Sequence, residues 1–338
     1  MQIPDQRPAA GELTMSYRIT LITPEEKDRL VEQFAPAVRY EIKSEIYGCC
    51  IKLLADDPVL KDAWLENFYN MSQNIRSHGR MYVFRDPGHP PDTVFYDPQS
   101  RTAFLINFSY YGWIKSLALS LAGDVLEDEH AIFSVHGALV DVAGNGLCLI
   151  GTSGAGKTTQ TYGLLKHPAT RIVSDDWFFS RTFGPEILAY GSEKNFYIRQ
   201  DLESVWKEYG GLVRADEYDR NGRAVADIRW VIGKGRLLPM TTLRTVIVLK
   251  RDPADRNTVQ GLSVEAALAL FSKNNFFNPH LLVTSPYKTE IRMKYIKQLF
   301  ERTAIYEVNT TGTPAETQRM IRSLVSVPQE EQPEGESP

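Results

Sequence analysis

Short apolar runs separated by turn-forming residues dominate the front of the chain. Alternating or apolar stretches predict strands over 16–22, 38–54 (a pair turning at Gly48) and 80–85. Thr23-Pro24-Glu25-Glu26 combines an N-cap residue, a proline at the first helical position and an acidic first turn, so it predicts a helix start. Helical spacing of apolar residues predicts a second helix over 58–77. Together these elements indicate a small α/β unit.

A cluster of breaker residues, Asp86-Pro-Gly-His-Pro-Pro-Asp92, predicts a domain boundary after this unit. The pattern beyond it predicts a hairpin (93–96 and 102–108), a helix over 111–122 ended by Gly123, strands over 132–135, 138–142, 147–150, 171–173 and 245–249, and a capped helix over 313–325. We therefore expect a flexible leader over 1–15, an N-terminal α/β domain over 16–92 suited to recruiting a substrate, a larger domain over 93–325 and a disordered acidic tail over 326–338.

The strand predicted at 147–150 runs into a glycine-rich loop and then a helix-compatible segment that extends to Lys166. Its glycines, lysine and threonine stand at the offsets of a phosphate-binding P-loop. In such a loop, backbone N–H groups and the helix N-terminus surround phosphates, the lysine reaches the β- and γ-phosphates, and the threonine hydroxyl holds Mg²⁺. The predicted nucleotide-binding residues are Gly151, Thr152, Ser153, Gly154, Ala155, Gly156, Lys157, Thr158 and Thr159.

Composition narrows the class of protein. The chain has 338 residues, 43% hydrophobic and 24% charged, as in ordinary globular proteins. A net charge of −4 without a long basic run gives no support to a nucleic-acid partner. No apolar stretch approaches the roughly 18 residues of a membrane span, and the start resembles no signal peptide. Three cysteines without a C-x-x-C indicate neither a disulfide framework nor a zinc site. We expect a cytoplasmic protein with no membrane partner, and a homo-oligomer stays open.

A P-loop needs a second metal ligand or a base from a neighbouring strand, and two positions compete for that role. Asp175-Asp176 ends the strand that follows the P-loop helix, where we expect the next parallel strand to deliver side chains beside the phosphates. Asp252 follows the strand at 245–249 but precedes Pro253, which favours helix capping there. The adjacent pair is the better candidate, because one carboxylate can hold Mg²⁺ while the other faces the nucleophile.

The sequence around the P-loop resembles one superfamily. His136-Gly-Ala-Leu-Val-Asp-Val-Ala-Gly-Asn-Gly146 precedes the loop and Asp175-Asp176 follows it. HPr kinase/phosphorylases carry a similar H-G-x-L-V-D-V-x-G-x-G stretch, a P-loop and a double Asp. Phosphoenolpyruvate carboxykinases carry G-x-S-G-x-G-K-T-T and a double Asp, and Tyr110-Tyr-Gly-Trp-Ile-Lys115 resembles their Y-x-G-x-x-K element. The resemblance implies an α/β fold, with a P-loop sheet of the HPr kinase/carboxykinase type behind a smaller N-terminal α/β domain.

The resemblance also implies roles for single residues. Lys157 would bind the nucleotide phosphates, while Thr158 and Asp176 would hold Mg²⁺, with Mn²⁺ as an alternative metal. Asp175 matches the HPr kinase aspartate that acts as base on the acceptor hydroxyl. His136 matches a residue beside the transferred phosphate that is a metal ligand in carboxykinases. Lys115 matches a further carboxykinase metal ligand, although Trp113 and Ser116 depart from that family's pattern.

Other departures concern the substrate. The chain lacks the E-x-R-G-x-G-I-I-D signature of HPr kinases and an arginine-rich oxaloacetate motif, so we expect an HPr-kinase-related protein and not HPr kinase itself. Cationic residues downstream are candidate contacts to the substrate or its phosphates, with a solvated surface as the alternative: Lys194, Arg199, Lys234 and Arg236.

These observations favour an ATP-dependent kinase that transfers the γ-phosphate to a hydroxyl of a peptide, a protein or a small molecule. Carboxykinase-like chemistry on a small carboxylic acid is one alternative. A module that senses ATP without transferring phosphate is another, although an intact Asp175-Asp176 pair argues against it. The sequence does not identify the acceptor.

Overall fold

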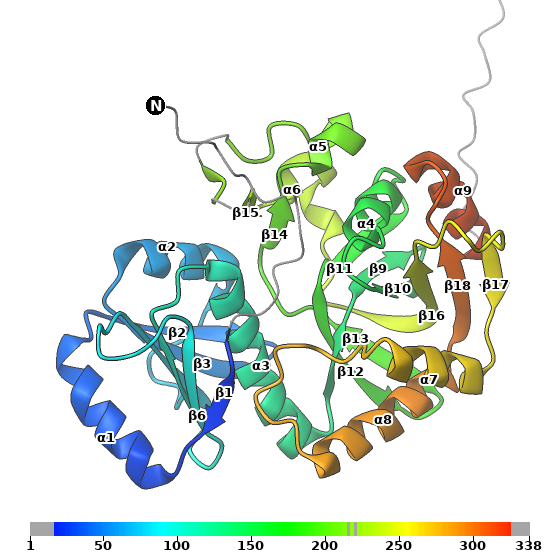
Figure 1. The fold of residues 1–338 in the computed structure, drawn as a ribbon. Coiled ribbons are helices and arrows are strands. Elements are labelled where there is room, and N and C mark those ends of the chain that lie inside the picture. Colours follow the sequence, from blue (N-terminus) through cyan, green and yellow to red (C-terminus); the bar gives the residue numbers. More distant parts are fainter. Residues whose placement is uncertain (1–16, 215–216, 220–221, 326–338) are drawn as a thin grey trace, which may run out of the picture.

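Two β-sheets, each covered by helices, make up most of the protein, and the long helix α3 (Tyr111–His130) lies between them (Figure 1). The computed structural model describes residues 17–214, 217–219 and 222–325. The leader expected over 1–15 and the tail expected over 326–338 lie outside these residues. No described helix is both long and apolar enough to cross a membrane.

The first sheet has seven strands among the described residues, in the order β1-β6-β7-β5-β3-β2-β4. Its strands are β1 (Ile19–Leu21), β2 (Tyr40–Ile46), β3 (Cys49–Ala55), β4 (Tyr69–Asn70), β5 (Gly79–Phe84), β6 (Thr93–Asp97) and β7 (Thr102–Ile106). The predicted turn at Gly48 is confirmed: Tyr47 and Gly48 both have positive φ, 44° and 75°, and join β2 to β3. Such left-handed pairs suit the twist of a two-residue hairpin.

Helices cover both faces of the first sheet. Helix α1 (Pro24–Phe34) begins at a capping box formed by Thr23 and Glu26, as predicted, and packs Phe34 against Phe84. Helix α2 (Pro58–Asn67) packs Trp64 on the other face, where α3 also lies. The prediction of a helix over 58–77 was too long, because α2 ends at Asn67.

The domain boundary expected at residues 86–92 does not fall between the two sheets. Strands β6 and β7 belong to the first sheet, where β7 pairs in parallel with β5. The breaker cluster is an ordered loop between β5 and β6: the backbone N–H of Asp86 donates to Asn107 Oδ1 at 2.8 Å, and Asn107 Nδ2 donates to the Asp86 carbonyl at 2.7 Å. We propose a division after Ile106 instead.

Helix α3 continues through Gly123, where the sequence predicts its end. A Cβ at Gly123 would lie 3.4 Å from the ring of Phe179, so the glycine permits close packing inside the helix. The helix ends at Ala131, which adopts a left-handed conformation with φ 50°. Most of α3 is buried, and residues such as Leu117 join one apolar cluster with Leu53 of the first sheet and Trp177 of the second.

The second sheet has nine strands among the described residues, with β11-β9-β10-β16-β13-β12-β8 as its main path and β18 and β17 continuing from β16. Its strands are β8 (Phe133–His136), β9 (Ala138–Val142), β10 (Asn145–Gly151), β11 (Thr170–Ser174), β12 (Trp177–Phe183), β13 (Glu186–Tyr190), β16 (Met240–Lys250), β17 (Val259–Gly261) and β18 (Ala304–Asn309). The sheet is mixed: β10, β16 and β18 are parallel, whereas β9 is antiparallel to β10 and to β11.

Alternate side chains of the central strands enter two separate cores. In β10, Leu147 and Leu149 face α4 (Lys157–Leu165) and α9 (Pro314–Leu324). Cys148 and Ile150 face α7 (Val264–Lys273) and α8 (Pro286–Phe300) instead. This alternation is what the two-residue period of a strand buried on both faces requires. The capping box predicted for the last helix is confirmed at Thr313 and Glu316.

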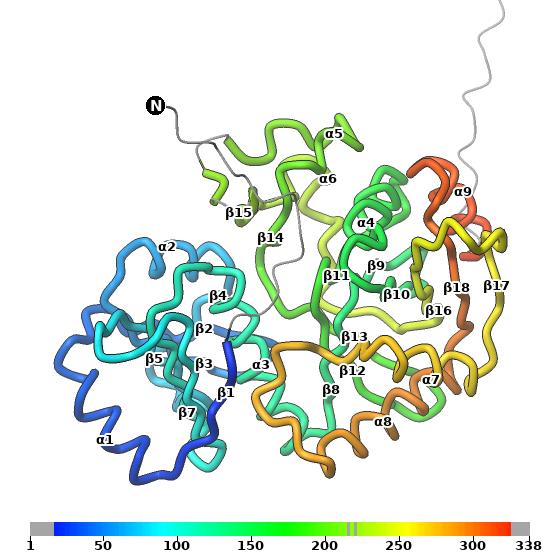
Figure 2. Tube along the Cα trace, in the orientation of Figure 1, coloured from blue at the N-terminus to red at the C-terminus, as the bar shows by residue number. Residues whose placement is uncertain are grey.

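A small third layer lies beside the P-loop helix. It contains β14 (Phe196–Arg199) paired with β15 (Arg223–Ala226), and the short helices α5 (Leu202–Val205) and α6 (Arg229–Ile232) (Figure 2). Trp206 donates its Nε1–H to the Thr159 carbonyl at 2.8 Å, and Tyr209 donates its hydroxyl to the Tyr162 carbonyl at 2.8 Å. The described part of 207–236 is therefore packed on α4, whereas the sequence suggests a mobile segment or lid.

Candidate active site

Strand β10 ends in the predicted glycine loop, and α4 begins at Lys157. Gly154 and Gly156 have φ values of 76° and 97°, a left-handed conformation that favours glycine. At Gly151 a Cβ would lie 2.6 Å from the Leu249 carbonyl oxygen of the neighbouring strand β16. Glycine at these positions therefore lets the loop turn tightly between the strand and the helix.

The Lys157 ammonium lies against this loop. It donates to the carbonyl oxygens of Gly151 at 2.7 Å and Thr152 at 3.3 Å. Burial lowers the pKa of Lys157, although the Asp176 carboxylate opposes that shift. The side chain is thus held over the loop, at the place where a P-loop binds phosphates.

Asp175 and Asp176 follow β11. The sequence predicts that this strand lies next to β10, and the structure differs from that prediction. The antiparallel strand β9 lies between β10 and β11. Asp175 is buried, and its Oδ1 is among the buried polar atoms without a hydrogen-bond partner. Burial, and then the charge of Glu193, raise the pKa of Asp175, while Lys115 opposes the rise.

Asp176 has a different environment from its neighbour. About half of its side chain is exposed, and its Oδ1 lies 3.5 Å from His136 Nε2 at the end of β8. Burial opposes ionisation of Asp176, but the hydrogen bond and charge of His136 and the charges of Lys115 and Lys157 lower its pKa below the usual range. The site therefore contains one ionised, accessible carboxylate and one buried carboxylate that holds a proton more tightly.

Lys115 of α3 is almost fully buried and forms an ion pair. Its Nζ lies 3.1 Å from Glu193 Oε1 and 3.2 Å from Oε2. Asn67, at the end of α2, donates to the same Oε1 at 2.8 Å. Although burial alone would lower it, Glu193, Asp176 and Asp175 raise the pKa of Lys115 above its usual range. Lys115 therefore stays charged beside the carboxylate pair.

These residues line one cavity of about 710 Å³, the P-loop cavity. Its walls bring together most of the predicted site: Lys115, His136, Thr152, Ser153, Gly154, Gly156, Lys157, Thr158, Thr159, Asp175, Asp176 and Arg199. Gly151 and Ala155 shape the loop but do not line the cavity. Arg199 also forms an ion pair with Asp201 at 2.9 Å.

Three of the predicted substrate contacts do not line the cavity. Arg236 donates to the carbonyls of Leu165, His167 and Thr170 at 2.6 Å each, so it holds the chain after α4. Lys194 donates to the Leu65 carbonyl at 3.3 Å, and Lys234 is exposed. Because backbone carbonyls hold the Arg236 guanidinium outside the cavity, it has a structural role there.

The alternative carboxylate, Asp252, has a structural role. Its Oδ1 accepts the backbone N–H of Ala254 at 2.9 Å, and the side chain does not line the cavity. This is the turn-capping role that the following proline favours.

Sequence reasoning missed several cavity residues. Arg251 follows the central strand β16, where the apolar run at 245–249 could have pointed to it, and no ion pair or hydrogen bond of its guanidinium is found among the described residues. Glu193 does not line the cavity but forms the ion pair with Lys115, and the sequence, where it stands next to Lys194, did not indicate that role. The run at 276–280, for which the sequence favours core packing over a pocket, contributes Asn278 and His280 to the lining, and His280 stacks on Trp177 with ring centroids 6.5 Å apart. Burial lowers the pKa of His280 to about 4.

The cavity suits a metal ion that is bound together with phosphates. No group of three or more His, Cys, Asp or Glu side chains among the described residues could hold a metal alone. A magnesium ion in a nucleotide site needs only one or two protein carboxylates besides phosphates and water. The Asp176 carboxylate, whose pKa is lowered, and the Thr158 hydroxyl are oxygen donors of the kind that such an ion prefers, and both residues line the cavity.

Comparison with known proteins supports one relationship. No protein-family model matches the chain. Over 136 residues, or 40% of the chain, it is 26% identical to a provisionally named HPr kinase/phosphorylase of Fusobacterium nucleatum. The matched part spans only 22% of that curated relative. The HPr(Ser) kinase/phosphatase of Coxiella burnetii aligns with a TM-score of 0.33 and 12% identity, over 57% of this chain and 93% of that one. The predicted resemblance to HPr kinases is confirmed as a sequence similarity over 40% of the chain.

Proposed function

We propose that this HPr-kinase-related chain is an ATP-dependent phosphotransferase that acts on a hydroxyl group. One observation carries the proposal: the P-loop lysine and the Asp175-Asp176 pair line the same cavity, with His136 beside Asp176. Phosphate binding alone would need only the loop. A buried carboxylate whose pKa is raised is an additional feature that suits proton transfer.

Each residue of the cavity has a separate role in the proposed transfer. Lys157 and the loop N–H groups bind the β- and γ-phosphates, and Thr158, Asp176 and His136 are the side chains that would hold Mg²⁺ or Mn²⁺. The bound metal ion supplies positive charge that neutralises the phosphates. As the acceptor oxygen bonds to the γ-phosphorus, Asp175 takes the hydroxyl proton and the bond to the ADP oxygen breaks. Burial raises the pKa of Asp175, so its carboxylate is a stronger base than an exposed aspartate.

Arg199 and Arg251, which line the same cavity, are placed to counter charge on the transferred phosphoryl group. The acceptor is a hydroxyl of a peptide, a protein or a small molecule. Carboxykinase-like chemistry receives less support, because the Lys115 ammonium is bound by Glu193 and shielded by burial. A free amine would be needed there for direct metal binding.

Labelled γ-phosphate tests the proposal. We expect transfer from ATP to a component of cell extract by the wild-type chain, and at least a hundredfold less transfer by Asp175→Asn with nucleotide binding retained, because the amide cannot take the proton. Asp252→Asn is the matched control, since Asp252 lies outside the cavity, and it should transfer normally. Tight ATP binding without transfer to any acceptor would instead indicate the ATP-sensing module.

A further inference from the structure

A second cavity, at the edge of the first sheet, is lined by three arginines, a histidine and three uncharged polar residues, without a carboxylate among them. It measures about 350 Å³ and lies where β5 and β7 begin. Its cationic lining comes from Arg76, Arg80 and Arg101, with His78 and Ser77 between them. We refer to it as the arginine pocket. The P-loop cavity shares none of its residues.

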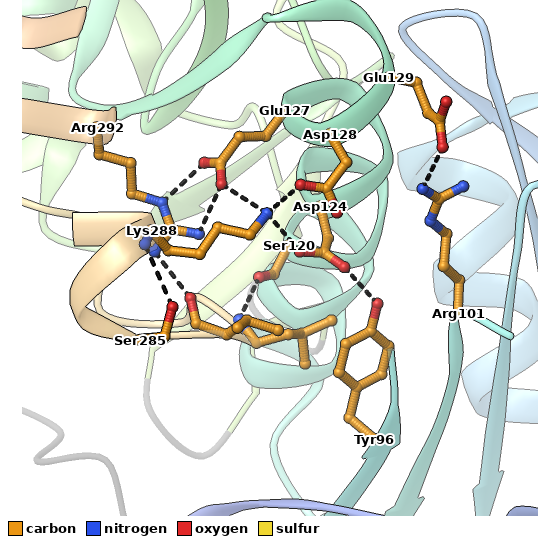
Figure 3. A network of polar contacts seen from close by, with 12 residues as sticks. Tyr96, Arg101, Ser120, Asp124, Glu127, Asp128, Glu129, Ser285, Lys288 and Arg292 are labelled. Atoms are coloured by element: carbon orange, nitrogen blue, oxygen red, sulfur yellow. Dashed lines mark hydrogen bonds and ion pairs between the residues drawn. The ribbon is translucent and has the colours of Figure 1, made fainter. Parts of the chain in front are cut away.

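Two of its three arginines have no partner. Among the described residues, no ion pair or hydrogen bond of the Arg76 or Arg80 side chain is found, and both residues are exposed. Arg101 forms an ion pair with Glu129 at 2.6 Å, a contact visible at the right of Figure 3. The neighbouring Asp97 is buried and is bound within its own turn, where it accepts from the Ser100 hydroxyl at 2.5 Å. The positive charges of Arg76 and Arg80 are therefore not balanced by carboxylates of the pocket.

His78 adds a donor of defined orientation. Its Nδ1 accepts the backbone N–H of Cys50 at 2.8 Å, while its own backbone N–H donates to the Cys50 carbonyl at 2.8 Å. A neutral imidazole that accepts at Nδ1 carries its proton on Nε2. The free edge of the ring is therefore a donor, like the guanidinium groups.

The backbone at Arg101 is unusual as well. Arg101 has φ 51°, in the left-handed region that favours glycine, and its backbone carbonyl accepts the N–H of Arg80 at 2.9 Å. A residue with a side chain is less stable than glycine in that region. The strained position is occupied by a long cationic side chain in a pocket of other cations, and strain of this kind gathers at ligand sites.

We propose that the arginine pocket binds a phosphate monoester group. Guanidinium groups present paired N–H donors that match phosphate oxygens. Arg76 and Arg80, which have no partner among the described residues, could both bind one anionic group, with the His78 ring beside them. A phosphate monoester has three terminal oxygens and up to two charges, and therefore matches this pair better than a single carboxylate does. The volume of about 350 Å³ leaves room for a small organic part beside the phosphate.

O-phosphoserine is a suitable probe, with unmodified serine and glutamate as comparisons. We expect saturable binding of O-phosphoserine by calorimetry, and no comparable binding of serine or glutamate. Arg80→Ala should weaken it about tenfold to a hundredfold, as loss of a charged hydrogen bond does. Arg85→Ala is the matched control, because Arg85 is an exposed arginine at the other end of β5 and does not line the pocket.

The P-loop also attracts phosphates, so every titration is repeated in Lys157→Ala. Binding that persists there and disappears in Arg76→Ala/Arg80→Ala supports the pocket. Binding lost in Lys157→Ala, binding unchanged in the double arginine variant, or equal affinity for glutamate would overturn the proposal. A peptide bearing phosphoserine, titrated in parallel, distinguishes a protein-borne phosphate from a free one. The experiment measures no phosphotransfer, so its result is independent of the proposed function.

Discussion

The buried ion pair between Lys115 and Glu193 gives the clearest quantitative prediction. Their side chains are 3% and 0% exposed, and both carboxylate oxygens lie within 3.2 Å of the ammonium. Glu193→Ala would leave a buried ammonium without its main counter-ion and would remove the acceptor that Asn67 uses at 2.8 Å. Breaking a buried pair by removing one partner costs about 3–5 kcal/mol. We expect Glu193→Ala to lower the free energy of unfolding by that amount.

The removal of both charges is the matched control. In Lys115→Met/Glu193→Leu no uncompensated charge remains, and apolar replacements of buried pairs are often neutral or stabilising. We therefore expect the double variant to be more stable than Glu193→Ala by at least about 2 kcal/mol. Urea unfolding followed by circular dichroism measures this as a shift in midpoint at constant m-value. A loss below about 1 kcal/mol in Glu193→Ala, or a double variant as unstable as the single, would refute the reasoning.

Three further predictions concern the P-loop cavity. Lys157→Ala should weaken ATP binding by about tenfold or more in calorimetry while leaving the unfolding midpoint nearly unchanged, since its ammonium contacts only loop carbonyls. Gly151→Ala should lower the melting temperature and nucleotide affinity together, because its Cβ would lie 2.6 Å from the Leu249 carbonyl oxygen. Burial lowers the pKa of His280 to about 4, so between pH 4 and about 6.5 the unfolded chain binds more protons and stability rises with pH, by at most about 3 kcal/mol. His280→Gln should remove that part of the pH dependence of the unfolding free energy, and an unchanged profile would contradict it.

The sequence was most informative where chemistry depends on consecutive residues. The P-loop, the following helix and the double Asp are each encoded within a few positions, and the structure brings Lys157 and Asp176 to one cavity. Capping boxes at Thr23 and Thr313 were equally predictable, because each is a local exchange of hydrogen bonds.

Errors arose where tertiary packing outweighs a local signal. Gly123 is a helix breaker by propensity, yet it lies within α3 because Phe179 packs against it. The breaker cluster at 86–92 resembles a linker, but Asn107, at the end of the neighbouring strand β7, fixes it through two hydrogen bonds to Asp86. Lys194 and Arg236 looked like phosphate contacts, since a sequence cannot reveal that backbone carbonyls already bind them.

Contacts that depend on topology could not be predicted from the sequence, even where one of the residues, such as Lys115, was a candidate. Asn67, Lys115 and Glu193 come from three distant segments, and only the placement of α3 between the sheets brings them together (Figure 1). Similarly, Lys288 of α8 forms ion pairs with Asp124 and Glu127 in the C-terminal half of α3, as Figure 3 shows. Such contacts join segments more than 70 positions apart in the chain, and no local periodicity encodes them.

The position of Lys115 links the first sheet to the proposed chemistry. Its charge lies close enough to Asp175 and Asp176 to affect the pKa of both, and Glu193, which holds it, is held in turn by Asn67 of α2. A displacement of α2 would therefore change the environment of the carboxylate pair without touching the nucleotide. Because α2 packs in the core of the first sheet, that sheet fixes the position of Asn67 and, through Glu193, that of Lys115. It supplies part of the support for the charges that shift the pKa values of the two carboxylates in opposite directions.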